Sequence, residues 1–138
     1  MTKLYAVIDT NVLVSALLRW DSLPGAVMEQ ALMGGIIPVL SDEIIEEYRE
    51  VLARKKFCFQ KEDIQTLLDG IMYRGVFFEP IEINEPFVDS KDVVFYAVAM
   101  GVKKDNDAYL VTGNTRHFPL KAFVVTPREM LTILKGKE

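Results

Sequence analysis

The sequence contains one cysteine, no long apolar run and no excess of basic residues. Cys58 alone excludes an internal disulfide, so we expect side-chain packing to stabilise the chain, as in a reducing cytoplasm. No apolar stretch approaches about 18 residues, which argues against a membrane-spanning helix. We expect no signal peptide, because the apolar segment that follows Met1 is cut short at Asp9. These absences predict a cytoplasmic protein without a membrane partner.

Positive charge is also scarce. Sixteen Lys and Arg residues face twenty Asp and Glu residues, which gives a formal net charge of −4 at pH 7. This balance argues against a wholly basic surface that coats nucleic acid, so any contact with nucleic acid must be local. The 138 residues, 50% of them hydrophobic, suffice for one core, and no linker, repeat or low-complexity tract divides them. We therefore expect a single domain over residues 1–138.

Short apolar runs alternate with segments of helical periodicity along the chain. The last helix carries a capping box in Thr126-Pro127-Arg128-Glu129, with proline at its first position. Alternation of this kind predicts an α/β fold with a mostly parallel sheet and helices on both faces. The expected strands cover residues 4–8, 36–40, 76–78, 108–112 and 123–125, and the expected helices begin near residues 11, 22, 42, 64, 91 and 127.

Polar residues follow two of the expected strands directly. Asp9 comes after the first strand, and Thr112 and Asn114 come at the end of a later one. Ligands gather at the carboxyl ends of parallel strands, so these side chains are expected at one edge of the sheet. Carboxylate oxygens at such an edge are suitable ligands for Mg²⁺ or Mn²⁺. Asp9 also fits as the N-cap of the helix that follows, and the two roles are compatible.

Two helices supply further carboxylates. Asp92 begins an otherwise apolar helix, where it either answers an N-cap at Asp89 or reaches into a site. In the helix after Ser41, Glu47 lies about 100° from the centre of the apolar face, Glu43 about 140°, and the other two glutamates about 160°. Glu47 is therefore the glutamate best placed to lean toward the sheet, although a purely solvated role is an equal alternative.

Substrate contacts are suggested by residues near these acids. Arg116 and His117 follow Asn114 and could meet a phosphate, although His117 is equally typical of a packed loop histidine. Trp20 and Tyr48 can stack on a base, whereas aromatic residues more often serve in a core or an interface.

Four motifs in order resemble the PIN-domain nuclease family over essentially the whole chain. They are IDTN, EEYREVL, DSKD and LVTGNTRHFP, and the last matches the TGNxxHFP ending of VapC-like toxin components of toxin-antitoxin systems. The resemblance implies a three-layer α/β/α sandwich and an endoribonuclease that needs Mg²⁺ or Mn²⁺ and hydrolyses phosphodiesters of RNA. It also implies a homodimer and a small antitoxin protein as partner.

The resemblance assigns roles to individual residues. It places the metal-binding and catalytic carboxylates on Asp9, Glu47 and Asp92. The supporting hydroxyl falls on Thr112, and the amide that orients the first aspartate falls on Asn11.

Asn114 completes the implied catalytic set but departs from the family pattern, which often has a fourth acid there. An amide oxygen can ligate a cation yet adds no charge, so one ion is expected rather than two. An alternative is a catalytically impaired PIN-like module that acts by binding RNA or a protein. A phosphatase with Asp9 as nucleophile is a weaker alternative, because the second acid that such sites need is replaced by Asn11.

Overall fold

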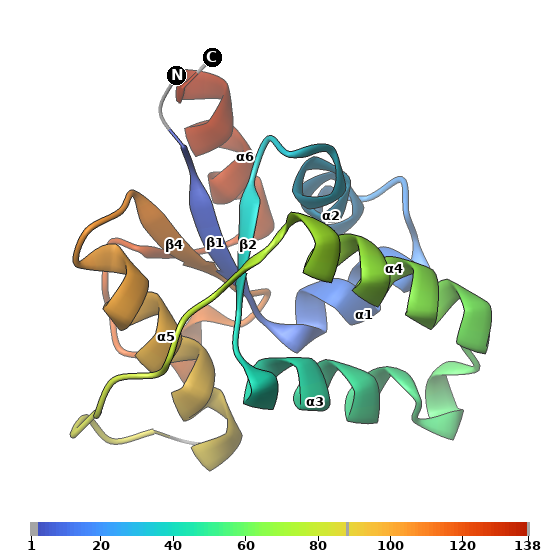
Figure 1. The fold of residues 1–138 in the computed structure, drawn as a ribbon, viewed down its shortest axis with the longest axis horizontal. Coiled ribbons are helices and arrows are strands. Elements are labelled where there is room, and N and C mark those ends of the chain that lie inside the picture. Colours follow the sequence, from blue (N-terminus) through green and yellow to red (C-terminus); the bar gives the residue numbers. More distant parts are fainter. Residues whose placement is uncertain (1–2, 88, 138) are drawn as a thin grey trace.

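A computed structural model describes residues 3–87 and 89–137, and its centre is one parallel sheet (Figure 1). Neighbouring strands all run parallel, in the order β3-β2-β1-β4-β5. The central strand β1 is buried because it pairs with β2 on one side and β4 on the other. Within the described residues the strands are β1 (Tyr5–Ile8), β2 (Ile37–Leu40), β3 (Val76–Phe77), β4 (Ala108–Val111) and β5 (Val124–Val125).

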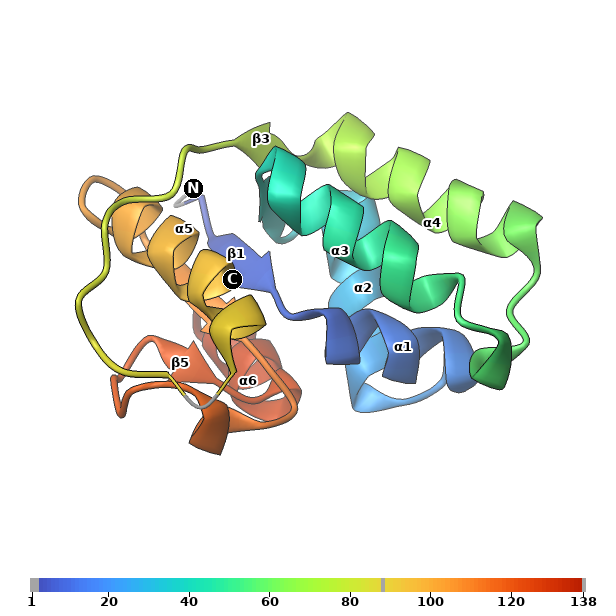
Figure 2. The ribbon, with the colours of Figure 1, turned by 90° about the horizontal axis from the view of Figure 1, so that it is seen from below.

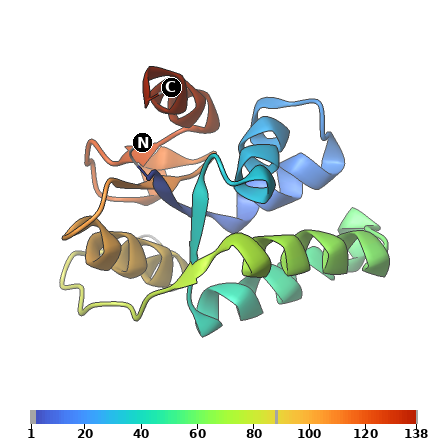
Figure 3. The ribbon, with the colours of Figure 1, turned by 45° about the horizontal axis from the view of Figure 1, so that its top comes forward.

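Helices cover both faces of the sheet (Figure 3). One face packs against α5, which contacts β1 and β4, and the other packs against α6, which contacts β4 and β5. The three-layer α/β/α arrangement predicted from the sequence is therefore confirmed. None of the helices in the described part of the chain is long and apolar enough to cross a membrane. The helices are α1 (Thr10–Leu18), α2 (Leu23–Met33), α3 (Asp42–Leu52), α4 (Lys61–Arg74), α5 (Val93–Lys103) and α6 (Pro127–Lys137).

Side-chain caps fix where several helices begin. Ser22 accepts a hydrogen bond from the Gly25 N–H at the start of α2, and Ser41 accepts one from the Ile44 N–H at the start of α3. At α6 the predicted capping box is present. Thr126 Oγ1 accepts from the Glu129 N–H at 3.1 Å, and the Glu129 carboxylate accepts from the Thr126 N–H at 2.9 Å.

The start of α5 differs from the prediction. Residues Ser90–Asp92 form a 3₁₀ turn, η2, and α5 begins only at Val93. Asp89 caps this turn, because its carboxylate accepts a hydrogen bond from the Lys91 N–H at 3.0 Å. The second hydrogen bond of a capping box, from Asp92 back to Asp89, is absent, because the Asp92 side chain forms no capping hydrogen bond. The tighter turn leaves the Asp92 carboxylate available for other contacts.

Tyr48 belongs to the core and not to a base-stacking surface. Its side chain is 1% exposed, packs on Phe95 and donates its O–H to the Ile8 carbonyl oxygen. Of the two roles considered for Tyr48, the core is therefore confirmed and stacking on a base is excluded. Burial and the charge of Asp9 both raise the pKa of Tyr48, so the phenol stays neutral. This hydrogen bond ties α3 to the end of β1, one residue before Asp9.

Tyr48→Phe is expected to lower the free energy of unfolding by about 1–2 kcal/mol, because it leaves the buried Ile8 carbonyl without this donor. Urea unfolding followed by circular dichroism measures the change. Tyr96→Phe is the matched control, because the Tyr96 O–H binds the partly exposed Glu85 carboxylate, which water can solvate instead. Equal losses in the two variants would contradict the assignment.

Candidate active site at the carboxyl edge of the sheet

Asp9 lies where the central strand ends and α1 begins (Figure 2). Ile8 pairs with Val111 across β1 and β4, which places Asp9 beside Thr112. The Asp9 side chain is 8% exposed, and its Oδ2 accepts a hydrogen bond from Thr112 Oγ1 at 2.8 Å. Asp9 occupies the N-cap position of α1 but makes no side-chain capping hydrogen bond. Its carboxylate is therefore held mainly by the neighbouring strand, and the N–H groups of Thr10 and Asn11 at the start of α1 also lower its pKa.

Thr112 links three polar groups through one buried hydroxyl. Its Oγ1 accepts from the Asn114 N–H at 3.0 Å and from Asn11 Nδ2 at 3.5 Å. The Asn11 Oδ1 in turn accepts from the Gly113 N–H at 3.1 Å. With both lone pairs of the hydroxyl engaged, its single proton points to Asp9. The Asn11 side chain thus contacts Thr112 and Gly113, and the Asn11 backbone N–H also acts directly on Asp9, whose pKa it lowers.

Asp92, His117 and Asn114 form the second part of the site. His117 Nδ1 lies 3.6 Å from Asp92 Oδ2, and the Asn114 side-chain nitrogen lies 2.9 Å from His117 Nε2. Asp92 Oδ2 is buried and accepts no hydrogen bond from the described residues. His117 therefore bridges two of the expected catalytic residues. Arg116, predicted as its companion, is exposed and lines a separate hollow.

The three acids influence one another electrostatically. Burial raises the pKa of Asp92 to about 6, and the negative charges of Asp9, Asp89 and Glu47 add to the rise, which His117 opposes. Burial also raises the pKa of Asp9 against the hydrogen bond from Thr112. Burial is also the main cause that raises the pKa of Glu47, and the charge of Asp9 adds a small contribution. Carboxylates from the end of β1, from α3 and from η2 thus share one region of the molecule.

Glu47 is the least exposed glutamate of α3. Its side chain is half-buried, whereas those of Glu43, Glu46 and Glu50 are exposed. This is the order that helical geometry predicts from the angle of each residue to the apolar face. The structure places Glu47 near Asp9 and Asp92, and its role in metal binding stays a prediction.

The fit to a cation rests on charge and not on a preformed cage. In residues 3–87 and 89–137, no three His, Cys, Asp or Glu side chains are arranged to hold a metal ion. The donors nevertheless suit a hard divalent ion, because they are carboxylate oxygens, and Asp92 Oδ2 lacks a hydrogen-bond donor. Burial is the main cause of the raised pKa values of Asp9 and Asp92, and for Asp92 the charges of Asp9, Asp89 and Glu47 add a repulsion that a cation would relieve. The residues therefore fit a divalent ion once their side chains turn toward one another.

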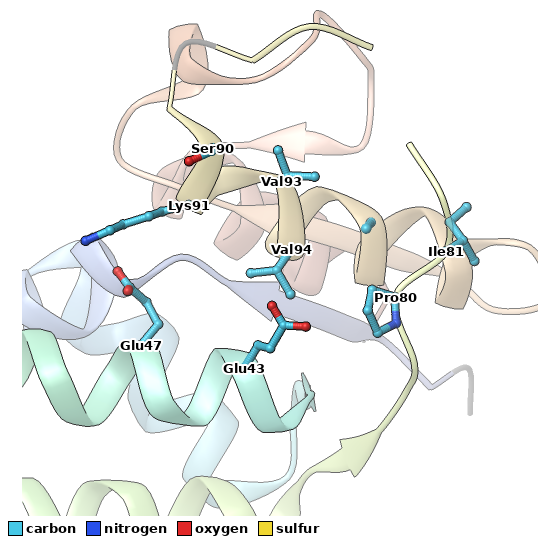
Figure 4. Close-up of a pocket in the computed structure, with 9 residues that line it drawn as sticks. Glu43, Glu47, Pro80, Ile81, Ser90, Lys91, Val93 and Val94 are labelled. Atoms are coloured by element: carbon cyan, nitrogen blue, oxygen red, sulfur yellow. The ribbon is translucent and has the colours of Figure 1, made fainter. Parts of the chain in front are cut away.

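Two residues near the acids were not predicted. Lys91 extends from η2 toward the Glu47 carboxylate, and its charge lowers the Glu47 pKa (Figure 4). Glu43 lines a groove together with Lys91 and Glu47, although the sequence assigned it to a solvated face. Spacing offered a signal for each: Lys91 directly precedes Asp92, and Glu43 lies one helical turn before Glu47 on α3.

The sequence model of the PIN domain family matches residues 5–116 of this chain. The chain belongs to the PIN domain family. Comparison with curated proteins finds no significant match. PIN domains are in general nucleases that use divalent metals, so this PIN domain is classed with the hydrolases. The matched segment includes Asp9, Glu47, Asp92 and Thr112, and ends immediately before His117.

Proposed function

We propose that this PIN domain is a divalent-metal-dependent endoribonuclease and the toxin half of a VapC-like toxin-antitoxin pair. The observation that supports catalysis most directly is that three acids from separate segments lie close enough to interact: the charge of Asp9 raises the pKa of both Glu47 and Asp92, and the charge of Glu47 raises that of Asp92. Acids that lie close together repel one another when no cation is present. When they share a cation, their charges bind it and the repulsion is relieved. RNA is the proposed substrate, and Mg²⁺ or Mn²⁺ the proposed cofactor.

The proposed mechanism is hydrolysis by in-line attack of water on phosphorus. Asp9, Asp92 and Glu47 would hold the ion, with Asn114 beside them. A bound Mg²⁺ or Mn²⁺ would supply positive charge for the phosphate oxygens and lower the pKa of water at the site. Thr112 keeps the Asp9 carboxylate in a fixed orientation. One carboxylate accepts the proton of the attacking water while the bond from phosphorus to the leaving sugar oxygen breaks.

Glu47→Gln is expected to reduce RNA cleavage at least about tenfold, because an amide keeps the size of the side chain but removes a charged ligand. Cleavage of defined RNAs with Mn²⁺, Mg²⁺ or EDTA measures the effect. Glu46→Gln is the matched control: it removes the same charge one position away on α3, from a side chain that lines a different hollow. We expect Glu46→Gln to cleave like the wild type.

Two outcomes would contradict the proposed nuclease. The first is cleavage that EDTA lowers but Mg²⁺ or Mn²⁺ fails to restore. The second is RNA binding by the wild type without cleavage under any metal condition. The second outcome would favour the catalytically impaired module, for which the uncharged Asn114 gives a structural reason.

Protein partners are part of the proposal. A homodimer and a small antitoxin need apolar surface, and the segment from the end of α1 to the start of α2 is our candidate for it. Leu18 is 62% exposed, Trp20 41% and Leu23 39%. Contiguous exposed apolar side chains are a common feature of protein interfaces. We assign dimer or antitoxin contact to this segment, and cytoplasmic action to the protein.

A further inference from the structure

A groove of about 400 Å³ runs along the molecule next to the candidate active site. One wall is α3, the other is η2 with the start of α5, and the chain after β3 closes one side (Figure 4). Its volume lies in the range of small-ligand pockets. The lining residues are Glu43, Glu47, Pro80, Ile81, Ser90, Lys91, Val93, Val94 and Ala97.

The two ends of the groove differ in chemistry. Lys91 and Glu47 lie at the end beside Asp92, where a phosphate near the scissile bond would arrive. At the other end the Glu43 carboxylate points between the apolar side chains of Val94 and Pro80 (Figure 4). A ligand for the whole groove therefore needs an anionic group at one end. At the other end it needs a flat apolar body with hydrogen-bond donors.

We propose that this groove binds one nucleotide of the substrate strand and that Glu43 selects guanine. The proposal rests on the proposed nuclease function and adds the base preference of the same site. Val94, Pro80 and Ile81 supply apolar surface for the faces of the base, and Lys91 supplies a cation for its phosphate. Single-stranded RNA is commonly read in this way, by contact with base faces and hydrogen bonds to Watson–Crick edges.

The carboxylate of Glu43 favours guanine over the other three bases. Guanine presents two adjacent donors, N1–H and the 2-amino group, which match the two oxygens of a carboxylate. Adenine and cytosine place an acceptor nitrogen beside their single amino group, and that nitrogen would face a carboxylate oxygen. Uracil presents one N–H between two carbonyl oxygens. Each of these three bases therefore sets at least one acceptor against Glu43.

The charges of the groove also fix the direction of the nucleotide. Glu43 and Glu47 repel a phosphate, whereas a neutral base meets no such repulsion. Lys91 is the one cation among the described lining residues, and it lies at the end near Asp92. The base accordingly enters the Glu43 end, and the phosphate stays beside Lys91.

The test is a titration of the protein in metal-free buffer. The ligands are the 5′-monophosphates of guanosine, inosine, adenosine, cytidine and uridine. Amide chemical shifts report affinity and location. We expect guanosine monophosphate to bind at least about fivefold more tightly than the other three standard nucleotides. Inosine monophosphate, which lacks the 2-amino group, should bind with intermediate affinity.

Glu43→Gln should reduce the affinity for guanosine monophosphate by about fivefold or more, because one acceptor becomes a donor. Glu46→Gln is the control with the same change of charge outside the groove, and it should bind like the wild type. Both substituted side chains are exposed, and melting temperatures verify that both variants fold.

Equal affinity for all nucleotides, absence of binding, shifts confined to the hollow around Arg116 and Lys121, or an unaffected Glu43→Gln would each overturn the proposal. The titration contains neither metal nor a bond to cleave, so its result is independent of nuclease activity. A protein that cleaves RNA without selecting guanine would retain the proposed function and lose only this inference.

Discussion

Asp92→Asn is expected to abolish cleavage while it stabilises the metal-free protein. The variant keeps the shape of the side chain but removes a charge that burial and three neighbouring acids disfavour. Loss of one metal-binding carboxylate should lower the cleavage rate at least about a hundredfold. In the absence of a cation, the repulsion between these acids lowers the free energy of unfolding of the protein. Activity and metal-free stability are therefore expected to change in opposite directions.

The pH dependence of stability has a definite sign. The pKa of Asp92 is about 6 in the folded protein, above its ordinary value of 3.8, so the folded state binds the proton more tightly than the unfolded state. The wild type should lose stability as the pH rises from about 4 to 6, and Asp92→Asn should lack this loss. The gain at neutral pH is expected to be about 1–2 kcal/mol, discounted because the side chain is 15% exposed.

Urea unfolding with EDTA between pH 4 and pH 8 measures this difference. Asp89→Asn is a graded comparison, because asparagine caps the η2 turn as well as aspartate does and the change removes only one of the charges that raise the pKa of Asp92, so a smaller gain is expected. A loss of stability in Asp92→Asn at neutral pH would show that the carboxylate makes a favourable contact, and would refute the crowded-acid interpretation.

Thr112→Val is expected to have the second largest effect, on both stability and cleavage. Valine has the shape of threonine, but it removes the donor to Asp9 and the acceptor for the Asn114 N–H. Buried polar groups left without partners should cost about 2–3 kcal/mol of unfolding free energy. The hydrogen bond from Thr112 lowers the pKa of Asp9, so its loss lets that pKa rise further. A protonated Asp9 binds a cation poorly, and cleavage should fall about 10- to 100-fold.

Thr112→Ser separates the hydroxyl from the methyl group. Serine restores both hydrogen bonds, so it should recover most of the activity and lose only the packing of one methyl group, about 1 kcal/mol. Melting temperature and initial cleavage rates give the two readouts. If the valine and serine variants lose activity equally, the hydroxyl does not position Asp9.

Local patterns were sufficient to predict the fold and the region of the candidate site. Strand and helix periodicities gave the parallel sheet, and the rule that ligands gather at carboxyl ends placed Asp9 next to Thr112 although 103 positions separate them. The angle of Glu47 on α3 gave its partial burial. The single-domain boundary, the metal ligands and the partners stay predictions.

Contacts between distant segments explain what the sequence did not predict. Glu43 looks solvated on its own helix, and only the chain around Pro80 and the start of α5 turn its surroundings into a groove. Tyr48 lies on the apolar face of α3, yet its hydroxyl partner is a backbone oxygen of β1. Two roles were open for Asp92, at the helix start or in the site, and the 3₁₀ turn capped by Asp89 leaves its carboxylate out of the capping role.

The order of strands has a consequence for biosynthesis. The strand β1 lies at the centre of the sheet, and one of its two neighbours is β4. Thr112 is translated 103 positions after Asp9, so it reaches Asp9 only after both segments have left the ribosome. A nascent chain that has not yet reached β4 therefore lacks the hydroxyl that holds the Asp9 carboxylate.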